Sequence, residues 1–154
     1  MKSIYTVIMA LVIPFLMLSK SQVASAADED ECATYICLPA GFGPSECSDS
    51  YDAMVDRLED GDSPLPSWGA CFSDSDSDSV IPIQTEYGNA TIVDSEFAKD
   101  QTCRRRANNE WEPVGCNGRN YWYIEVYDEK GTPYPLMNSD DNGATVGNTR
   151  YVPK

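Results

Sequence analysis

Six cysteines are the side chains with the clearest chemical potential in this chain of 154 residues, which contains no histidine. They are Cys32, Cys37, Cys47, Cys71, Cys103 and Cys116. An even number of cysteines in a short exported chain is typical of a disulfide framework. Zinc is the competing interpretation, but the sequence has no C-x-x-C spacing and no histidine to complete a mixed site. We therefore expect disulfides, and neither a metal nor a cofactor.

Carboxylates are the other groups that could do chemistry. Asp74, Asp76 and Asp78 resemble the start of a calcium loop, but Ser79 stands where the loop needs glycine. Residues 138–143 match the first half of such a loop better, and weak calcium binding there stays open. With 25 acidic side chains, some pair at catalytic spacing is almost inevitable, so carboxylate spacing carries no signal. We expect no catalytic residues and no enzyme.

Four arginines and three tyrosines are candidates for a partner surface. Arg104, Arg105 and Arg106 form the only basic cluster together with Arg119, and ion pairing with the chain's own carboxylates is favoured over an acidic partner. The tyrosines, on one face of an expected strand, either pack inside the fold or form an exposed aromatic surface; they are Tyr121, Tyr123 and Tyr127.

Residues 1–26 predict a cleaved signal peptide, because Lys2 precedes an apolar stretch of residues 4–18 that ends on small residues. This stretch is shorter than the ~20 residues that span a bilayer, and no later segment is apolar enough to do so. Cleavage would leave 25 acidic and 9 basic side chains, a net charge of −16. That charge opposes binding to nucleic acid or anionic lipid and favours a basic protein partner. The cysteines then imply an oxidising compartment.

Residues 27–72 are expected to form a helical hairpin with a proline-rich strap. Asp30 can cap a first helix with Cys32, Tyr35 and Ile36 on one face, which Pro39 and Gly41 stop. The second helix, capped by Gly43 or Ser45, has the clearest amphipathic pattern and ends at Gly61; its apolar positions are Tyr51, Met54, Val55 and Leu58. Residues 63–71, with two prolines, predict an extended strap.

Helix geometry restricts the fifteen possible cysteine pairings. Cys32 and Cys37 would lie about 7.5 Å apart along one helix, beyond the ~7 Å limit for a disulfide. In an antiparallel hairpin, Cys37 lies near Cys47, and the returning strap brings Cys71 to Cys32. The expected pairs are therefore Cys32–Cys71, Cys37–Cys47 and Cys103–Cys116.

The remaining residues are expected to complete a small, disulfide-rich α+β fold with a C-terminal antiparallel β-hairpin or small sheet. Residues 73–79 alternate serine and aspartate and predict an acidic linker. Residues 80–137 belong to the same domain, with short strands at 80–83 and 91–93, a helix at 95–107, a strand at 121–127 and a return strand at 132–137. Trp122, Ile124 and Val126 alternate along the strand at 121–127. Residues 138–154 form a polar, loosely ordered tail.

The cysteine block Cys32 to Cys47, followed by an amphipathic helix and the Ser63-Pro64-Leu65-Pro66 strap, resembles the TrbM/KikA family of conjugal transfer proteins. The resemblance continues through Cys116, the aromatic strand and the Lys130-Gly131 turn, and covers about residues 31–137. It implies a periplasmic accessory component of the mating-pair formation apparatus of a type IV secretion system, without enzymatic activity. The implied partners are other secretion-system or pilus components.

Two further interpretations stay open beside this one. The first is a secreted disulfide-rich effector or inhibitor that uses the same scaffold on a foreign target. The second is a small cell-wall hydrolase that depends on carboxylates.

Overall fold

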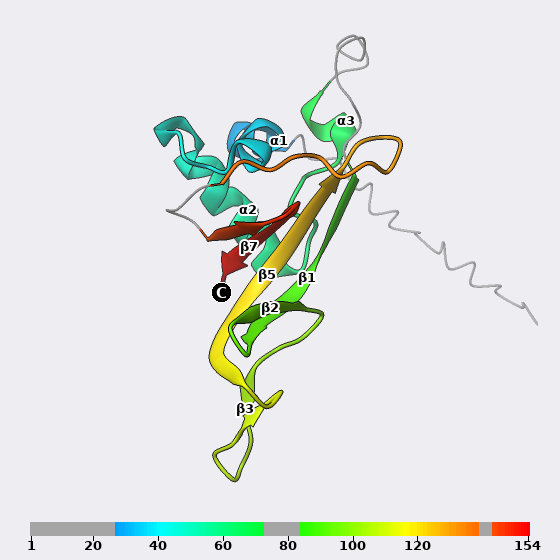
Figure 1. The fold of residues 1–154 in the computed structure, drawn as a ribbon. Helices are drawn as coiled ribbons and strands as arrows, with labels where there is room; N and C mark the ends of the chain where they lie inside the picture. The colour runs from blue at the N-terminus through cyan, green and yellow to red at the C-terminus, as the bar shows by residue number, and fades with distance from the viewer. Residues whose placement is uncertain (1–26, 73–83, 139–142) are drawn as a thin grey trace, which may run out of the picture.

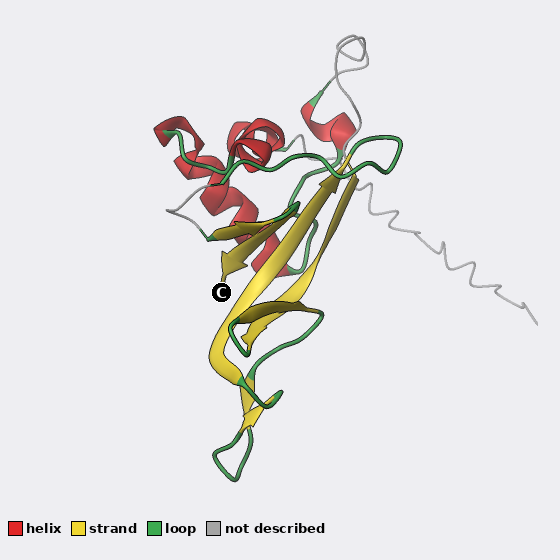
Figure 2. Ribbon diagram, in the orientation of Figure 1, coloured by secondary structure: helices red, strands yellow, loops and turns green. Residues whose placement is uncertain are grey.

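The computed structural model describes residues 27–72, 84–138 and 143–154 (Figure 1). The predicted signal peptide, the acidic linker 73–79, the strand expected at 80–83 and most of the possible calcium loop at 138–143 therefore lie outside the described residues. The described chain is α+β, as predicted, with helices at its N-terminal side and an antiparallel sheet formed by its C-terminal part (Figure 2).

Helix α1 spans Glu29–Ala40 and ends at Gly41, which adopts a φ of +81°. Three acidic side chains in its first turn complement the helix dipole, and the backbone N–H of Asp28 donates to the Glu31 carboxylate at 3.2 Å. Tyr35 is buried, as expected, but Ile36 is 75% exposed. The expectation for Ile36 is wrong because the buried face turns by one position, toward Thr34, Cys37 and Leu38.

Helix α2 spans Ser48–Asp60 after a short 3-10 turn, η1, at Ser45–Cys47. Met54 and Leu58 are buried against α1, and the helix ends at Gly61 with a φ of +85°, as its pattern predicts. An ion pair of 2.9 Å between Arg57 and Glu31 also joins the two helices.

The structure contains the three predicted disulfides. Cys37–Cys47 links the end of α1 to η1, Cys32–Cys71 links α1 to the strap, and Cys103–Cys116 closes a loop in the C-terminal part. The strap is not extended throughout, because Trp68–Cys71 forms the short helix α3. This turn stacks Trp68 on Phe72 at 3.9 Å between ring centres and sets both rings edge-on to Tyr35.

Five antiparallel strands form the sheet in the order β2-β1-β5-β7-β6. Their bounds are β1 Gln84–Val93, β2 Glu96–Lys99, β5 Cys116–Tyr127, β6 Ala144–Val146 and β7 Thr149–Pro153. The predicted alternation along β5 is confirmed, because Trp122, Ile124 and Val126 are buried in one cluster with the helices.

The helix expected at residues 95–107 is wrong. Asp94 and Ser95 have φ values of +49° and +73°, so the chain turns sharply back after β1 and forms β2. The turn places Phe97 on the aromatic rings of Tyr121 and Tyr151, at 5.1 and 3.9 Å between ring centres. Residues 91–93 are a strand, as expected, but they are the last part of the ten-residue β1.

The predicted return strand at 132–137 and the predicted loose tail are also wrong. Only one β-bridge, Tyr127 to Pro133, forms after the turn, where Pro133 and Pro135 cannot donate a backbone hydrogen bond. β7 takes the place beside β5 and pairs with it at five positions. Arg150, Tyr151 and Val152 of β7 are buried, so the end of the chain belongs to the core.

Candidate functional site

The candidate site is a short two-stranded arm formed by β3, Arg104–Arg105, and β4, Trp111–Glu112. In the arm Arg104 pairs with Glu112 and Arg105 pairs with Trp111. Figure 1 shows the arm extending from the end of the sheet that lies farthest from the helices. The basic cluster of the sequence is thus presented at one end of the molecule.

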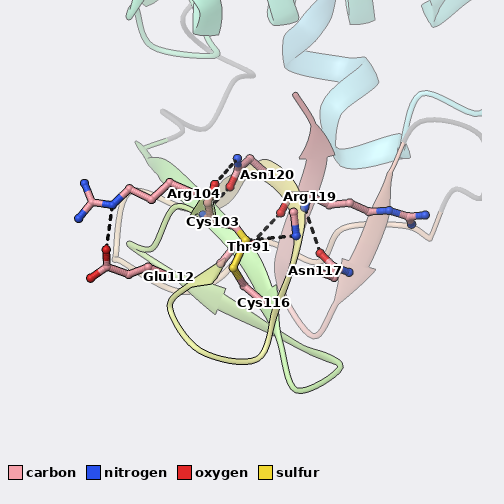
Figure 3. Close-up of a disulfide and its surroundings, with 9 residues drawn as sticks. Thr91, Cys103, Arg104, Glu112, Cys116, Asn117, Arg119 and Asn120 are labelled. Carbon is pink, nitrogen blue, oxygen red and sulfur yellow. Dashed lines mark hydrogen bonds and ion pairs between the residues drawn. A yellow bond between two sulfur atoms is a disulfide. The ribbon is translucent and has the colours of Figure 1, made fainter. Parts of the chain in front are cut away.

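The Cys103–Cys116 disulfide closes the base of the arm, and Asn120 fixes this base to β5 (Figure 3). The Asn120 side chain accepts from the N–H of Cys103 at 2.7 Å and donates to its carbonyl at 3.0 Å. The hydroxyl of Thr91 donates to the carbonyl of Arg119 at 2.6 Å, which ties the same base to β1. The arm therefore leaves the sheet from a cross-linked and hydrogen-bonded root.

Two of the three consecutive arginines pair with the chain's own Glu112, which is the interpretation that the sequence favoured. Arg104 lies at 3.2 Å from the Glu112 carboxylate, and Arg106 donates to it from Nε at 2.9 Å. The hydrogen bond from Arg106 lowers the pKa of Glu112 to about 2. Both pairs are exposed to solvent, so they fix the shape of the arm more than they stabilise the fold.

Arg105 and Arg119 are the cations of this region for which the described residues offer no ion pair. The guanidinium of Arg105 lies 5.6 Å from the centre of the Trp111 ring, a cation–π distance. Figure 3 shows the exposed Arg119 side chain directed away from the disulfide and from Glu112. These two cations are available for an acidic group of a partner.

Exposed apolar groups accompany the cations. Trp111 is 40% exposed and Val114 is 89% exposed. The Trp111 ring lies over Gly118, where an added Cβ would come within 2.9 Å of it. Tryptophan and arginine are, with tyrosine, the residues enriched in binding hot spots. Here Trp111 and Arg105 already contact each other in the unbound chain.

The predicted tyrosine surface divides between core and half-buried positions. Tyr121 is buried with Tyr151 in a small cluster of its own. Tyr123 donates to Asp100 at 3.1 Å, and burial together with this bond raises its pKa. Tyr127 donates to Glu125 at 2.9 Å, a hydrogen bond that raises its pKa. Tyr123 and Tyr127 thus bind the chain's own carboxylates, whereas Tyr121 lines an open pocket together with Arg119.

The helical end of the molecule is strongly acidic. Residues 27–72 carry eleven acidic side chains and a single basic one, Arg57. Eight of the carboxylates line an open groove along α1 and α2, namely Asp28, Asp30, Glu31, Asp49, Asp52, Asp56, Asp60 and Asp62. The acidic helices thus lie at one end of the described chain, and the arm, in which Glu110 and Glu112 accompany the three arginines, lies at the other (Figure 1).

The described residues contain no group of three or more histidine, cysteine or carboxylate side chains that could hold a metal ion. All six cysteines are used in disulfides. Three disulfides indicate an oxidising, extracellular or periplasmic compartment. Among residues 27–72, 84–138 and 143–154, no helix is long and apolar enough to cross a membrane.

No family model, curated protein or solved structure matches this chain. The arginines of the arm were predicted from the sequence as candidates, whereas Trp111 and Asn120 were not. An aromatic residue between two bonded cysteines, in an otherwise polar segment, was a signal for Trp111, whereas nothing local distinguishes Asn120.

Proposed function

We propose that this chain is an exported, disulfide-linked accessory protein of a conjugative type IV secretion system, and that it acts in the periplasm by binding other protein components of that machine. The observation that carries the proposal is the arm, because it holds Arg105 and Trp111 at the surface on a cross-linked root, beside the exposed Arg119 of β5. The resemblance of the cysteine block and strap to the TrbM/KikA family supplies the machine.

Binding, and not catalysis, is the activity that this arrangement supports. The arm presents cations and an aromatic ring, which recognise an acidic protein surface with an apolar contact at its centre. The strong negative charge of the rest of the chain opposes nucleic acid as the partner. The proposed partner of the arm is therefore an acidic protein surface of the secretion machine or the pilus.

Gene deletion followed by a mating assay tests the proposal. We expect deletion to lower DNA transfer to recipient cells, and the intact chain to restore it. A chain with Arg105→Ala, Trp111→Ser and Arg119→Ala should fail to restore transfer, while Lys130→Ala, which removes an exposed cation far from the arm in sequence, should restore it.

Three measurements make this test decisive. The first is the periplasmic level of oxidised protein. It should be equal for the two variants, because every substituted side chain is exposed and its loss should not prevent folding. Normal transfer and pilus assembly in the deletion strain would refute the proposal. Recovery of the protein in the culture medium would instead support the secreted effector.

A further inference from the structure

The first half of β1 has no neighbouring strand on its outer side within the described chain. β5 pairs with β1 from Gln84 onward, whereas β2 pairs only with the four residues from Ala90 to Val93. Figure 2 shows β2 lying beside the far end of β1 and leaving the rest of this edge open. About six residues of strand therefore form a free sheet edge.

The backbone groups of Thr85 and Tyr87 point out of this edge. The carbonyl of Asn89 accepts from the N–H of Asp100 at 2.7 Å, so Asn89 faces outward. In an antiparallel strand the N–H and C=O of one residue point to the same side, and this side alternates along the chain. Tyr87 and Thr85 thus offer two donors and two acceptors to an added strand.

Natural proteins usually protect such an edge with proline, lysine or a bulge. From Gln84 to Asn89 the edge has none of these, and Glu86 is its one charged residue. Glu86 lies directly opposite Glu125 across the β1–β5 pair. Lys99 binds Glu125 at 2.8 Å, and no ion pair of the described residues reaches Glu86. A cation placed beside Glu86 would relieve this repulsion between like charges.

On the face of the sheet opposite Glu86, a groove of mixed polarity lies beside the same edge. Thr85 lines this groove with the apolar side chains of Leu65, Pro66 and Trp68, and the charged Arg57 and Asp62 also line it. The Thr85 hydroxyl lies 3.4 Å from that of Ser63. Side chains of an added strand alternate between the two faces. One set would enter the groove, and the other would lie beside Glu86.

We propose that the open half of β1 binds an extended segment of another protein, as an added strand in which basic and apolar side chains alternate. Backbone hydrogen bonds to Thr85 and Tyr87 supply the affinity, while the groove and Glu86 select the side chains. A second copy of this chain fits poorly. Pairing Thr85 with Tyr87 of the copy would set the two Glu86 carboxylates opposite each other. This inference rests on the proposed function only in taking the chain as a protein-binding module.

Hydrogen exchange of the oxidised full chain, followed by NMR, tests the edge. The probe is a synthetic ten-residue peptide of alternating lysine and valine, and the matched control replaces each lysine with glutamate. We expect saturating lysine peptide to slow exchange of the Thr85 and Tyr87 amides at least about tenfold, because both amides enter hydrogen bonds. The glutamate peptide should leave both rates unchanged.

A proline substitution separates edge pairing from other binding. Tyr87→Pro removes an outward N–H without removing a donor from the β1–β5 ladder, so the strand can tolerate it. We expect it to weaken lysine-peptide binding at least about tenfold, whereas Tyr87→Val, which keeps the N–H, should bind normally. The exchange rates of the unsubstituted chain decide the question even if the proline variant does not fold.

Three outcomes would overturn the inference. They are unchanged amide exchange with the lysine peptide at about 1 mM, equal protection by the glutamate peptide, and protection that appears on concentrating the protein alone. The last result would assign the edge to a second copy. None of these measurements involves DNA transfer, so a failure here leaves the mating assay to judge the proposed function separately.

Discussion

At the scale of single residues, Arg150 joins the end of the chain to the helices. Its side chain is fully buried, donates to the carbonyl of Gly41 at 2.9 Å and lies 5.9 Å from the ring of Phe42. Burial lowers its pKa. The guanidinium is thus a polar connection between β7 and the turn after α1.

Replacing Arg150 with alanine should therefore destabilise the fold. We expect Arg150→Ala to lower the free energy of unfolding by about 3 kcal/mol, since it leaves the Gly41 carbonyl without its donor and opens a cavity. Urea unfolding followed by circular dichroism measures the change. The matched control is Arg119→Ala, at an exposed position, which should change stability by less than about 0.5 kcal/mol. Equal effects of the two substitutions would contradict the role of Arg150.

Glu112 supplies a second prediction at this scale. Its pKa is lowered from 4.5 to about 2 by the hydrogen bond from Arg106. Folding lowers the pKa of Glu112 below its value in the unfolded chain. The ion pair with Arg106 is therefore fully formed at a pH above the unfolded-state pKa, and it is lost as the pH falls through about 2. NMR titration of the carboxyl carbon should show this midpoint, and Arg106→Gln should move it up toward 4.5. A midpoint near 4.5 in the unsubstituted chain would show that the pairing is absent in solution.

At the scale of elements, the disulfides hold together segments of different span. Cys32–Cys71 joins residues 39 positions apart and fixes α1 to the strap, whereas Cys103–Cys116 spans 13 positions and closes only the arm. A longer closed loop restricts the unfolded chain more. The two bonds should therefore differ both in energy and in the region that depends on them.

Paired serine substitutions test this difference. We expect loss of Cys32–Cys71 to cost about 4 kcal/mol and loss of Cys103–Cys116 about 3 kcal/mol in the chain-entropy model. The second variant should keep the amide protection of α1, α2 and β5 while the arm becomes sensitive to proteolysis. Denaturant unfolding together with hydrogen exchange measures both effects. Global loss of protection in the arm variant would mean that the core depends on its root.

At the scale of the whole molecule, β7 completes the core in which helices and sheet meet. Its residue Val152 lies in the same buried cluster as residues of α1, α2 and β5. A chain shortened after residue 147 should therefore lose cooperative unfolding, since β5 would lose the strand that pairs with one of its two edges. Removing only Lys154 should leave the thermal transition in place. A folded shortened chain, seen by circular dichroism and calorimetry, would contradict the assignment of β7 to the core.

The features that the sequence predicted are those encoded by neighbouring residues. Three such features depend only on residues close together in the sequence. They are the helical spacing of Met54 and Leu58, the end of α2 at Gly61 and the alternation of buried residues along β5. The cysteine pairing followed from the two helices, because helix geometry excludes Cys32 with Cys37, and an antiparallel hairpin with a returning strap brings the observed partners together. The arginine cluster and its pairing with a nearby carboxylate are also local, and were within reach for that reason.

The features that the sequence did not predict depend on contacts between residues far apart along the chain. Residues 96–99 form a strand because Phe97 packs on Tyr121 and Tyr151, and no pattern within that segment indicates those contacts. Residues 149–153 of the polar tail form a strand because β5 has a free edge with which they pair. Arg150 is buried because the carbonyl of Gly41, 109 positions earlier, accepts its hydrogen bond. The sequence by itself determined the cross-links, the helices α1 and α2 and the charges. Only the tertiary structure decided which strands pair, how the arm is presented and where β1 is left open, because these depend on which distant segments meet.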